Sequence, residues 1–185
     1  NTRTDLHEYV PSEEIPKGAK TTASSVDGSD VFQHGLKNWT DMFNERQLLC
    51  LATLLRSIEK IPNQNAREFL LLAFSEALNF NTMMVPYQAA RNHTTNLFKS
   101  NSFDPPQGSS EGNLWGTEFG IGRFKSTYDM IRKGVEYANS PTDRYYEEGE
   151  TKETPSFSQP IGQNSEVYQD DMRNITAENE FDAVI

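Results

Sequence analysis

The sequence predicts a mainly α-helical protein, and three observations support this prediction. Apolar residues recur at helical spacing in three segments, at about residues 45–61, 64–79 and 124–138. Prolines follow the first and third segments, where a helix has to end. Only residues 61–63 link the first two segments, which favours an antiparallel pair. We therefore expect a helical hairpin and a third amphipathic helix, with long irregular loops and flanks.

Residues 1–35 are expected to form an irregular or extended N-terminal flank, and residues 36–146 the helical domain. The flank is rich in Ser, Thr, Gly, Lys and Asp, and its few apolar residues stand alone. In the domain, the first helix is expected to begin after Asn44, because Gln47 follows at the spacing of a capping box. Cys50 lies among the leucines of this helix, so we interpret it as an apolar core residue.

The second helix, from about Gln64 to Asn79, is expected to be the most buried of the three. Leu70, Ala73 and Phe74 begin one apolar face, while Phe69, Leu71 and Leu72 extend apolar surface around the rest of the helix. The prediction for this helix is therefore burial on nearly all sides.

Residues 80–121 show no clear period, and a long irregular segment in a compact domain is usually functional or mobile. His93 lies in this segment without a neighbouring His or Cys, so metal binding is not expected. The polar side chains of residues 91–96 favour either an ordinary polar loop or contacts with DNA. Gly120 and Gly122 precede the third helix, and a plain junction is favoured over an anion site.

The third helix carries an apolar stripe on one side and interleaved charges on the other. Lys125 lies four residues before Asp129, a spacing that favours a solvated, salt-bridged face over a phosphate-binding one. After this helix the composition becomes acidic. Residues 147–180 are expected to be an acidic linker, and residues 181–185 the start of a truncated strand.

Composition excludes several classes of protein. The chain has 185 residues, a net charge of −10 and a mean hydropathy of −0.71, and it lacks an apolar run of the length that a spanning helix needs. Residues 147–185 hold two Lys or Arg against ten Asp or Glu, whereas residues 44–146 hold eleven against ten. The near-neutral middle therefore leaves a nucleic acid partner open. No secretory signal is visible, so a cytoplasmic protein is expected. We predict no catalytic residue, cofactor site or metal site in this chain.

Several segments occur in the order found in one enzyme family. Residues 35–49 contain Trp39 and then Arg46-Gln47-Leu48-Leu49 at the start of a helix. Further segments lie at residues 70–81, 91–103, 113–116 and 134–141, and the chain ends in Phe181-Asp182-Ala183-Val184-Ile185. Together they resemble large prokaryotic adenine-specific DNA methylases of the Asp-Pro-Pro-Tyr type, over about residues 35–146.

The resemblance implies an internal helical segment, inserted in an α/β methyltransferase ahead of the catalytic motif. The start at Asn1 and the apolar end at Ile185 would then be cut ends of a longer enzyme. The implied parent is a DNA adenine N6-methyltransferase of restriction-modification or defence, which uses S-adenosylmethionine. The donor site and the catalytic residues would belong to the remainder of that polypeptide, and this chain alone would be inactive.

Two roles stay open for such a segment, namely target recognition on DNA and bracing of the catalytic domain. Methylases that act on a base extrude it and contact its neighbours, so loop residues are the natural DNA contacts. The DNA-binding candidates are Arg91, Asn92, His93, Lys99, Arg123 and Lys125. The alternative from another class is a stand-alone helical protein-interaction module without a nucleic acid role.

Overall fold

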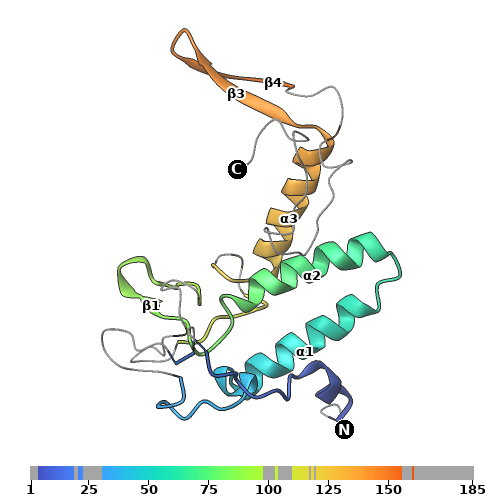
Figure 1. Cartoon of the computed structure of the whole chain (residues 1–185). Helices are drawn as coiled ribbons and strands as arrows, with labels where there is room; N and C mark the ends of the chain where they lie inside the picture. Colours follow the sequence, from blue (N-terminus) through green and yellow to red (C-terminus); the bar gives the residue numbers. More distant parts are fainter. Residues whose placement is uncertain are drawn as a thin grey trace, which may run out of the picture. The chain divides into compact units, whose positions relative to one another are not determined.

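A computed structural model describes residues 4–18, 21–22, 31–97, 103, 110–116, 118, 120–155 and 160 (Figure 1). The chain divides into two compact units, residues 1–134 and 135–185, which are described separately. The mainly α class is confirmed, because helices outweigh two short antiparallel strand pairs among these residues. None of the described helices combines the length and apolarity needed to cross a membrane.

The predicted helical hairpin is present as α1 (Glu45–Glu59) and α2 (Gln64–Leu78), which lie side by side (Figure 1). The capping box at the start of α1 is also confirmed. Asn44 Oδ1 accepts from the Gln47 N–H at 2.8 Å, and Gln47 Oε1 accepts from the Asn44 N–H at 3.0 Å. At the start of α2, the side chain of Asn63 accepts from a backbone N–H in the same way. Both helix starts are therefore satisfied by local side chains.

Two hydrophobic clusters hold the first unit together. The first joins α1 and α2 to Leu114, with buried residues Leu51, Leu54, Ile58 and Ala77, and the half-buried Cys50 packs against it. This packing agrees with the apolar role predicted for the cysteine.

The second cluster uses the N-terminal flank. Its buried members are Ile15, Val31, Met42 and Met84. One short 3₁₀ helix, η1 (Thr4–Tyr9), lies in the flank, and another, η2 (Trp39–Met42), follows it. The flank therefore contributes core residues through isolated apolar side chains and little regular structure.

The prediction that the second helix is the most buried is wrong. In α2 only Ala73 and Ala77 are buried, whereas α1 buries five residues. Phe69 and Leu72 are 44% and 56% exposed. The physical reason is that only one side of α2 faces α1, and apolar residues elsewhere on the helix meet little in the described part of the chain. An apolar composition around a helix does not itself provide neighbours.

The segment after α2 contains a small hairpin, β1 (Tyr87–Gln88), η3 (Ala89–Arg91) and β2 (His93–Thr94). Asn92 makes the reversal with φ of 52°, a left-handed conformation that Asn tolerates better than most residues. The following described residues are irregular until α3 (Phe124–Asn139) begins, as predicted.

A second hairpin, β3 (Thr142–Glu147) and β4 (Glu150–Pro155), lies in the unit of residues 135–185. The sequence analysis predicted no strands here and expected a linker from residue 147. Glu148 and Gly149 both have positive φ, the geometry of a two-residue hairpin turn, and Thr and Tyr flank it. Lys99, residues 181–185 and most of the expected linker lie outside the described residues.

Candidate functional site

A cavity of about 370 Å³ lies beside the start of α1, and we call it the amide pocket. It is lined by Arg46, Gln47, Cys50, Leu51, Asn81, Glu111, Gly112, Asn113, Leu114 and Trp115. These residues come from α1, from the turn after α2 and from residues 111–115. Three segments that are distant in the sequence therefore form one concave site.

Gln47 is held rigidly by its role in the capping box. Its side chain is only 4% exposed, and its Oε1 is engaged by the Asn44 N–H. The Nε2 of Gln47 is buried and has no hydrogen-bond partner among the described residues. The cap thus orients the amide group and leaves its NH₂ group without a partner among the described residues.

Asn81 is the reverse case, with an unused acceptor. It is 1% exposed, and its Nδ2 donates to the carbonyl oxygens of Ala77 and Gly122, both at 2.7 Å. Its Oδ1 is buried and has no partner among the described residues. Asn81 therefore ties the end of α2 to the approach to α3, while its oxygen stays unpaired.

Gly112 lies directly against this oxygen. A Cβ atom at position 112 would be 3.2 Å from Asn81 Oδ1 and 2.5 Å from the Phe80 carbonyl oxygen, closer than real side chains approach. The position therefore has to be glycine for the loop to approach the end of α2 so closely.

The charged groups of the amide pocket neutralise each other. Arg46 Nε and Nη2 donate to the two carboxylate oxygens of Glu111 at 2.7 and 2.5 Å, a bidentate pair. The hydrogen bonds from Arg46 lower the pKa of Glu111 below its ordinary value and raise that of Arg46. An occupant of the pocket would consequently meet no unpaired charge from this pair.

A second concavity, of about 470 Å³, adjoins the first and shares Glu111, Gly112 and Asn113 with it. We call it the loop cavity. It brings together three of the predicted DNA contacts, Asn92, His93 and Arg123. The Tyr87 hydroxyl donates to Asn92 Oδ1 at 2.5 Å, and the His93 ring donates from Nδ1 to the Thr94 carbonyl at 2.7 Å. These side chains are therefore held in place by their own hairpin.

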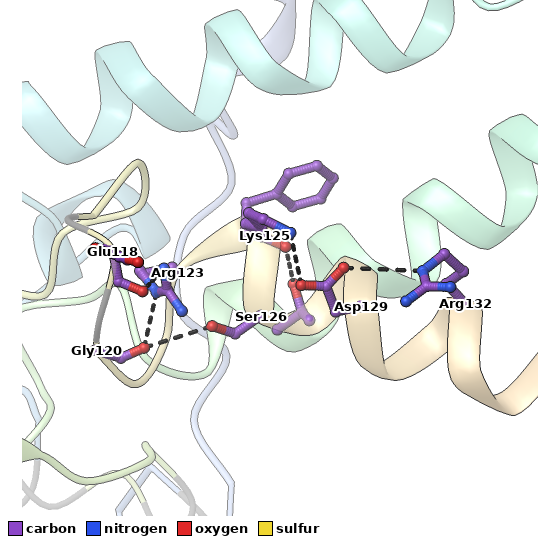
Figure 2. A network of polar contacts seen from close by, with 9 residues as sticks. Glu118, Gly120, Arg123, Lys125, Ser126, Asp129 and Arg132 are labelled. Atoms are coloured by element: carbon purple, nitrogen blue, oxygen red, sulfur yellow. Dashed lines mark hydrogen bonds and ion pairs between the residues drawn. The ribbon is translucent and has the colours of Figure 1, made fainter.

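Arg123 and Lys125 are engaged in the network drawn in Figure 2. Arg123 donates to the carbonyl oxygens of Gly120 and Glu118, at 3.0 and 2.6 Å. Lys125 pairs with Asp129 at 2.7 Å. The salt-bridged face predicted for the third helix is thus present, and Gly120 lies at a loop-to-helix junction. Lys125 is not among the residues that line the loop cavity.

Arg91 lies nearby, on a further concavity of about 340 Å³ that His93 also lines. Lys99 falls outside the described residues. The structure therefore brings four of the six candidates into one neighbourhood, around the β1–β2 hairpin and the residues before α3.

The sequence analysis did not single out Gln47, Asn81 or Trp115 as site residues. In the sequence, Gln47 is recognisable as a helix cap and as part of the resembling segment 35–49, and nothing indicates that the oxygen of an Asn after a helix will be buried and unpaired. Within the described residues, no group of His, Cys, Asp and Glu is arranged to hold a metal ion. The amide pocket is instead lined by apolar residues, an exposed aromatic ring, several amide side chains and the paired Arg46 and Glu111.

No protein-family model matches the chain, and no curated protein or solved structure is significantly similar to it.

Proposed function

We propose that this chain is the helical segment of an S-adenosylmethionine-dependent, adenine-specific DNA methyltransferase, with no catalytic residues of its own. In such an enzyme the exocyclic amine of adenine attacks the methyl group of the donor. The remainder of the polypeptide would supply the donor site and the catalytic residues. The proposal rests on the ordered resemblance of residues 35–146.

The arrangement of the resembling segments supports this proposal. Residues 35–49, 70–81 and 113–116 each contribute to the lining of the amide pocket. Residues 91–103 contribute Asn92 and His93 to the adjoining loop cavity. If the resembling segments together form a functional site, they are expected to lie close together in the folded chain, as they do here.

Contact with DNA is the role that we assign to the loop cavity. Arg123 is held by two backbone carbonyls, which presents its guanidinium in a defined position. Arg91 is exposed and lines one concavity with His93, and the loop cavity is lined by Asn92, His93 and Arg123. Arginine and short polar side chains are the usual contacts to phosphates and base edges.

The coding sequence provides the most direct test of the parent enzyme. Beyond Ile185, it is expected to encode an Asp-Pro-Pro-aromatic motif. A continuation without that motif would refute the methylase proposal.

DNA binding by the chain tests the role of the loop cavity. At low salt the chain is expected to bind duplex DNA, with an affinity that falls as salt rises. Arg91→Ala and Arg123→Ala should each weaken binding and reduce the salt slope by about one. The matched control is Lys60→Ala, at an exposed position after α1, which should leave both quantities unchanged. An equal effect of all three changes would contradict the assignment.

One observation favours the alternative, a stand-alone protein-interaction module. The exposed Phe69 and Leu72 of α2 form an apolar surface of the kind that protein partners cover. In the methylase proposal the remainder of the polypeptide covers it, which corresponds to the bracing role. Absence of both the downstream motif and DNA binding would favour the separate module.

A further inference from the structure

Asn113 lines the loop cavity and is exposed, and the orientation of its amide group is fixed by its own turn. Its Oδ1 accepts from the backbone N–H groups of Trp115 and Gly116, at 3.2 and 2.9 Å. Because a backbone N–H can only donate, the amide atom that faces these groups must be the oxygen. The Nδ2 group therefore lies on the side of the amide away from the turn, and it makes no hydrogen bond within the described residues.

The other amide and carboxylate oxygens in the described lining of the loop cavity are engaged as well. Asn92 is exposed, and its Oδ1 accepts from the Tyr87 hydroxyl, which leaves the Nδ2 group as its donor. Both carboxylate oxygens of Glu111 accept from Arg46. The described lining therefore presents amide N–H donors, whereas its amide and carboxylate acceptors are used within the protein.

Three glycines and a positioned arginine complete this lining. Gly112, Gly116 and Gly120 all line the loop cavity, and glycine lets a ligand approach the main chain closely. A Cβ atom at position 116 would overlap Cδ of Arg123, so the arginine stem packs against this glycine. The carbonyl oxygens of Gly120 and Glu118 hold its guanidinium (Figure 2), and Glu118 is not among the residues that line the cavity. A positive charge is thus held in place beside the amide donors.

We propose that the loop cavity binds a phosphate group, through the amides of Asn113 and Asn92 and the guanidinium of Arg123. Phosphate oxygens only accept hydrogen bonds, and arginine matches their charge. Every base pair instead presents an amino donor beside its acceptors in the major groove, and that donor would find no free amide or carboxylate oxygen in this lining. The inference rests on the proposed DNA contact, narrows it to the strand backbone, and adds Asn113 to the contacts.

A phosphate group can come from two sources, the backbone of a nucleic acid strand or a free phosphate compound. Calorimetric titration of the chain at low salt therefore uses two duplex DNAs of equal length and different sequence in one arm, and inorganic phosphate in the other. The two duplexes should bind with affinities that agree within about twofold, because phosphates carry no sequence information. A duplex with neutral methylphosphonate linkages should bind at least about tenfold more weakly than the unmodified one.

Asn113→Asp removes the Nδ2 donor with little change of shape. The carboxylate still accepts from the N–H groups of Trp115 and Gly116, so the turn is retained while an oxygen replaces the donor. Whichever probe binds should lose at least about tenfold in affinity, because a hydrogen bond to a charged group is lost and a like charge is added. The matched control is Asn65→Asp at an exposed position of α2, which changes the net charge equally and should bind within about twofold of the unchanged chain.

Binding of the duplexes assigns the phosphate to a strand backbone. Binding of inorganic phosphate alone, with the same loss in Asn113→Asp, retains the phosphate site and refutes the proposed DNA contact. The inference is overturned if neither probe binds, or if Asn113→Asp and Asn65→Asp have the same effect. It is equally overturned if the two duplexes differ by more than about tenfold, or if neutral linkages leave the affinity unchanged. None of these outcomes depends on the downstream coding sequence, which tests the parent enzyme separately.

Discussion

Replacement of Asn81 by alanine should lower the free energy of unfolding, because the Asn81 side chain links two segments of the chain by hydrogen bonds. The Nδ2 group donates to the carbonyl oxygens of Ala77 and Gly122. Gly122 lies 41 residues from Asn81 in the sequence. Asn81→Ala removes both hydrogen bonds at once. The end of α2 then loses its polar connection to the residues that lead into α3.

The size of the stability loss depends on which hydrogen bonds each of the two carbonyl oxygens keeps after the substitution. The Ala77 oxygen still accepts from the backbone N–H groups of Asn79 and Phe80, so the loss there is about 1 kcal/mol. Gly122 is buried, and its oxygen has no other partner among the described residues, so leaving this oxygen unpaired costs about 1–3 kcal/mol. Removal of the already unpaired Oδ1 offsets about 1 kcal/mol, so the net loss is about 2 kcal/mol.

Urea unfolding followed by circular dichroism of the helices measures this loss. The midpoint should fall at constant slope, and the melting temperature should drop by about 4–8 °C. The matched control is Asn65→Ala on the exposed side of α2, which should change stability by less than about 0.5 kcal/mol. If Asn81→Ala is as mild as this control, the bridge does not hold the two segments together, and the reasoning is refuted.

Two glycines and one carboxylate provide the remaining predictions. Gly112→Ala should cost about 1–3 kcal/mol in urea unfolding, because the new Cβ would lie 2.5 Å from the Phe80 carbonyl oxygen. Gly134→Ala should instead stabilise the chain by about 0.5–1 kcal/mol, because this position lies within α3 and has open space around it; a loss of stability there would contradict the described environment. The pKa of Glu111 is lowered by Arg46, so its contribution to stability is present above the ordinary carboxyl pKa of 4.5 and is lost as pH falls through the lower folded-state pKa. The difference in melting temperature between the unchanged chain and Glu111→Gln should therefore be largest at neutral pH and should shrink as pH falls through the lowered pKa of Glu111, and a difference that does not change with pH would contradict this pairing.

The predicted helices were found where the controlling residues are close in the sequence. Asn44 and Gln47 are three residues apart, and Pro62 lies three residues after the last residue of α1, so the beginning and end of that helix depend on local chemistry. The β3–β4 hairpin was missed although its signal is also local. Glu148 and Gly149 form its turn, but the acidic composition around them was interpreted as a linker.

Burial was predicted less well, because it depends on which side of a helix finds a neighbour. Phe69 and Leu72 have the same apolar character as Leu51 and Leu54, yet only the latter two are buried. The hydrophobic effect acts on whatever surface is removed from water, and one sequence period does not specify the partner that removes it. The sequence therefore does not indicate which apolar side of α2 stays exposed to solvent.

The sequence by itself determined the helical class, the start of α1, the hairpin of α1 and α2, and the charge pairing along α3. Each depends on residues within about one helical turn or one short loop. Only the tertiary structure decided that Arg46 pairs with Glu111, 65 residues away, and that Gln47 and Asn81 share a cavity. The physical reason is that an unpaired polar atom is defined by everything that surrounds it. The groups around the amide pocket come from three distant parts of the chain, and only folding brings them together.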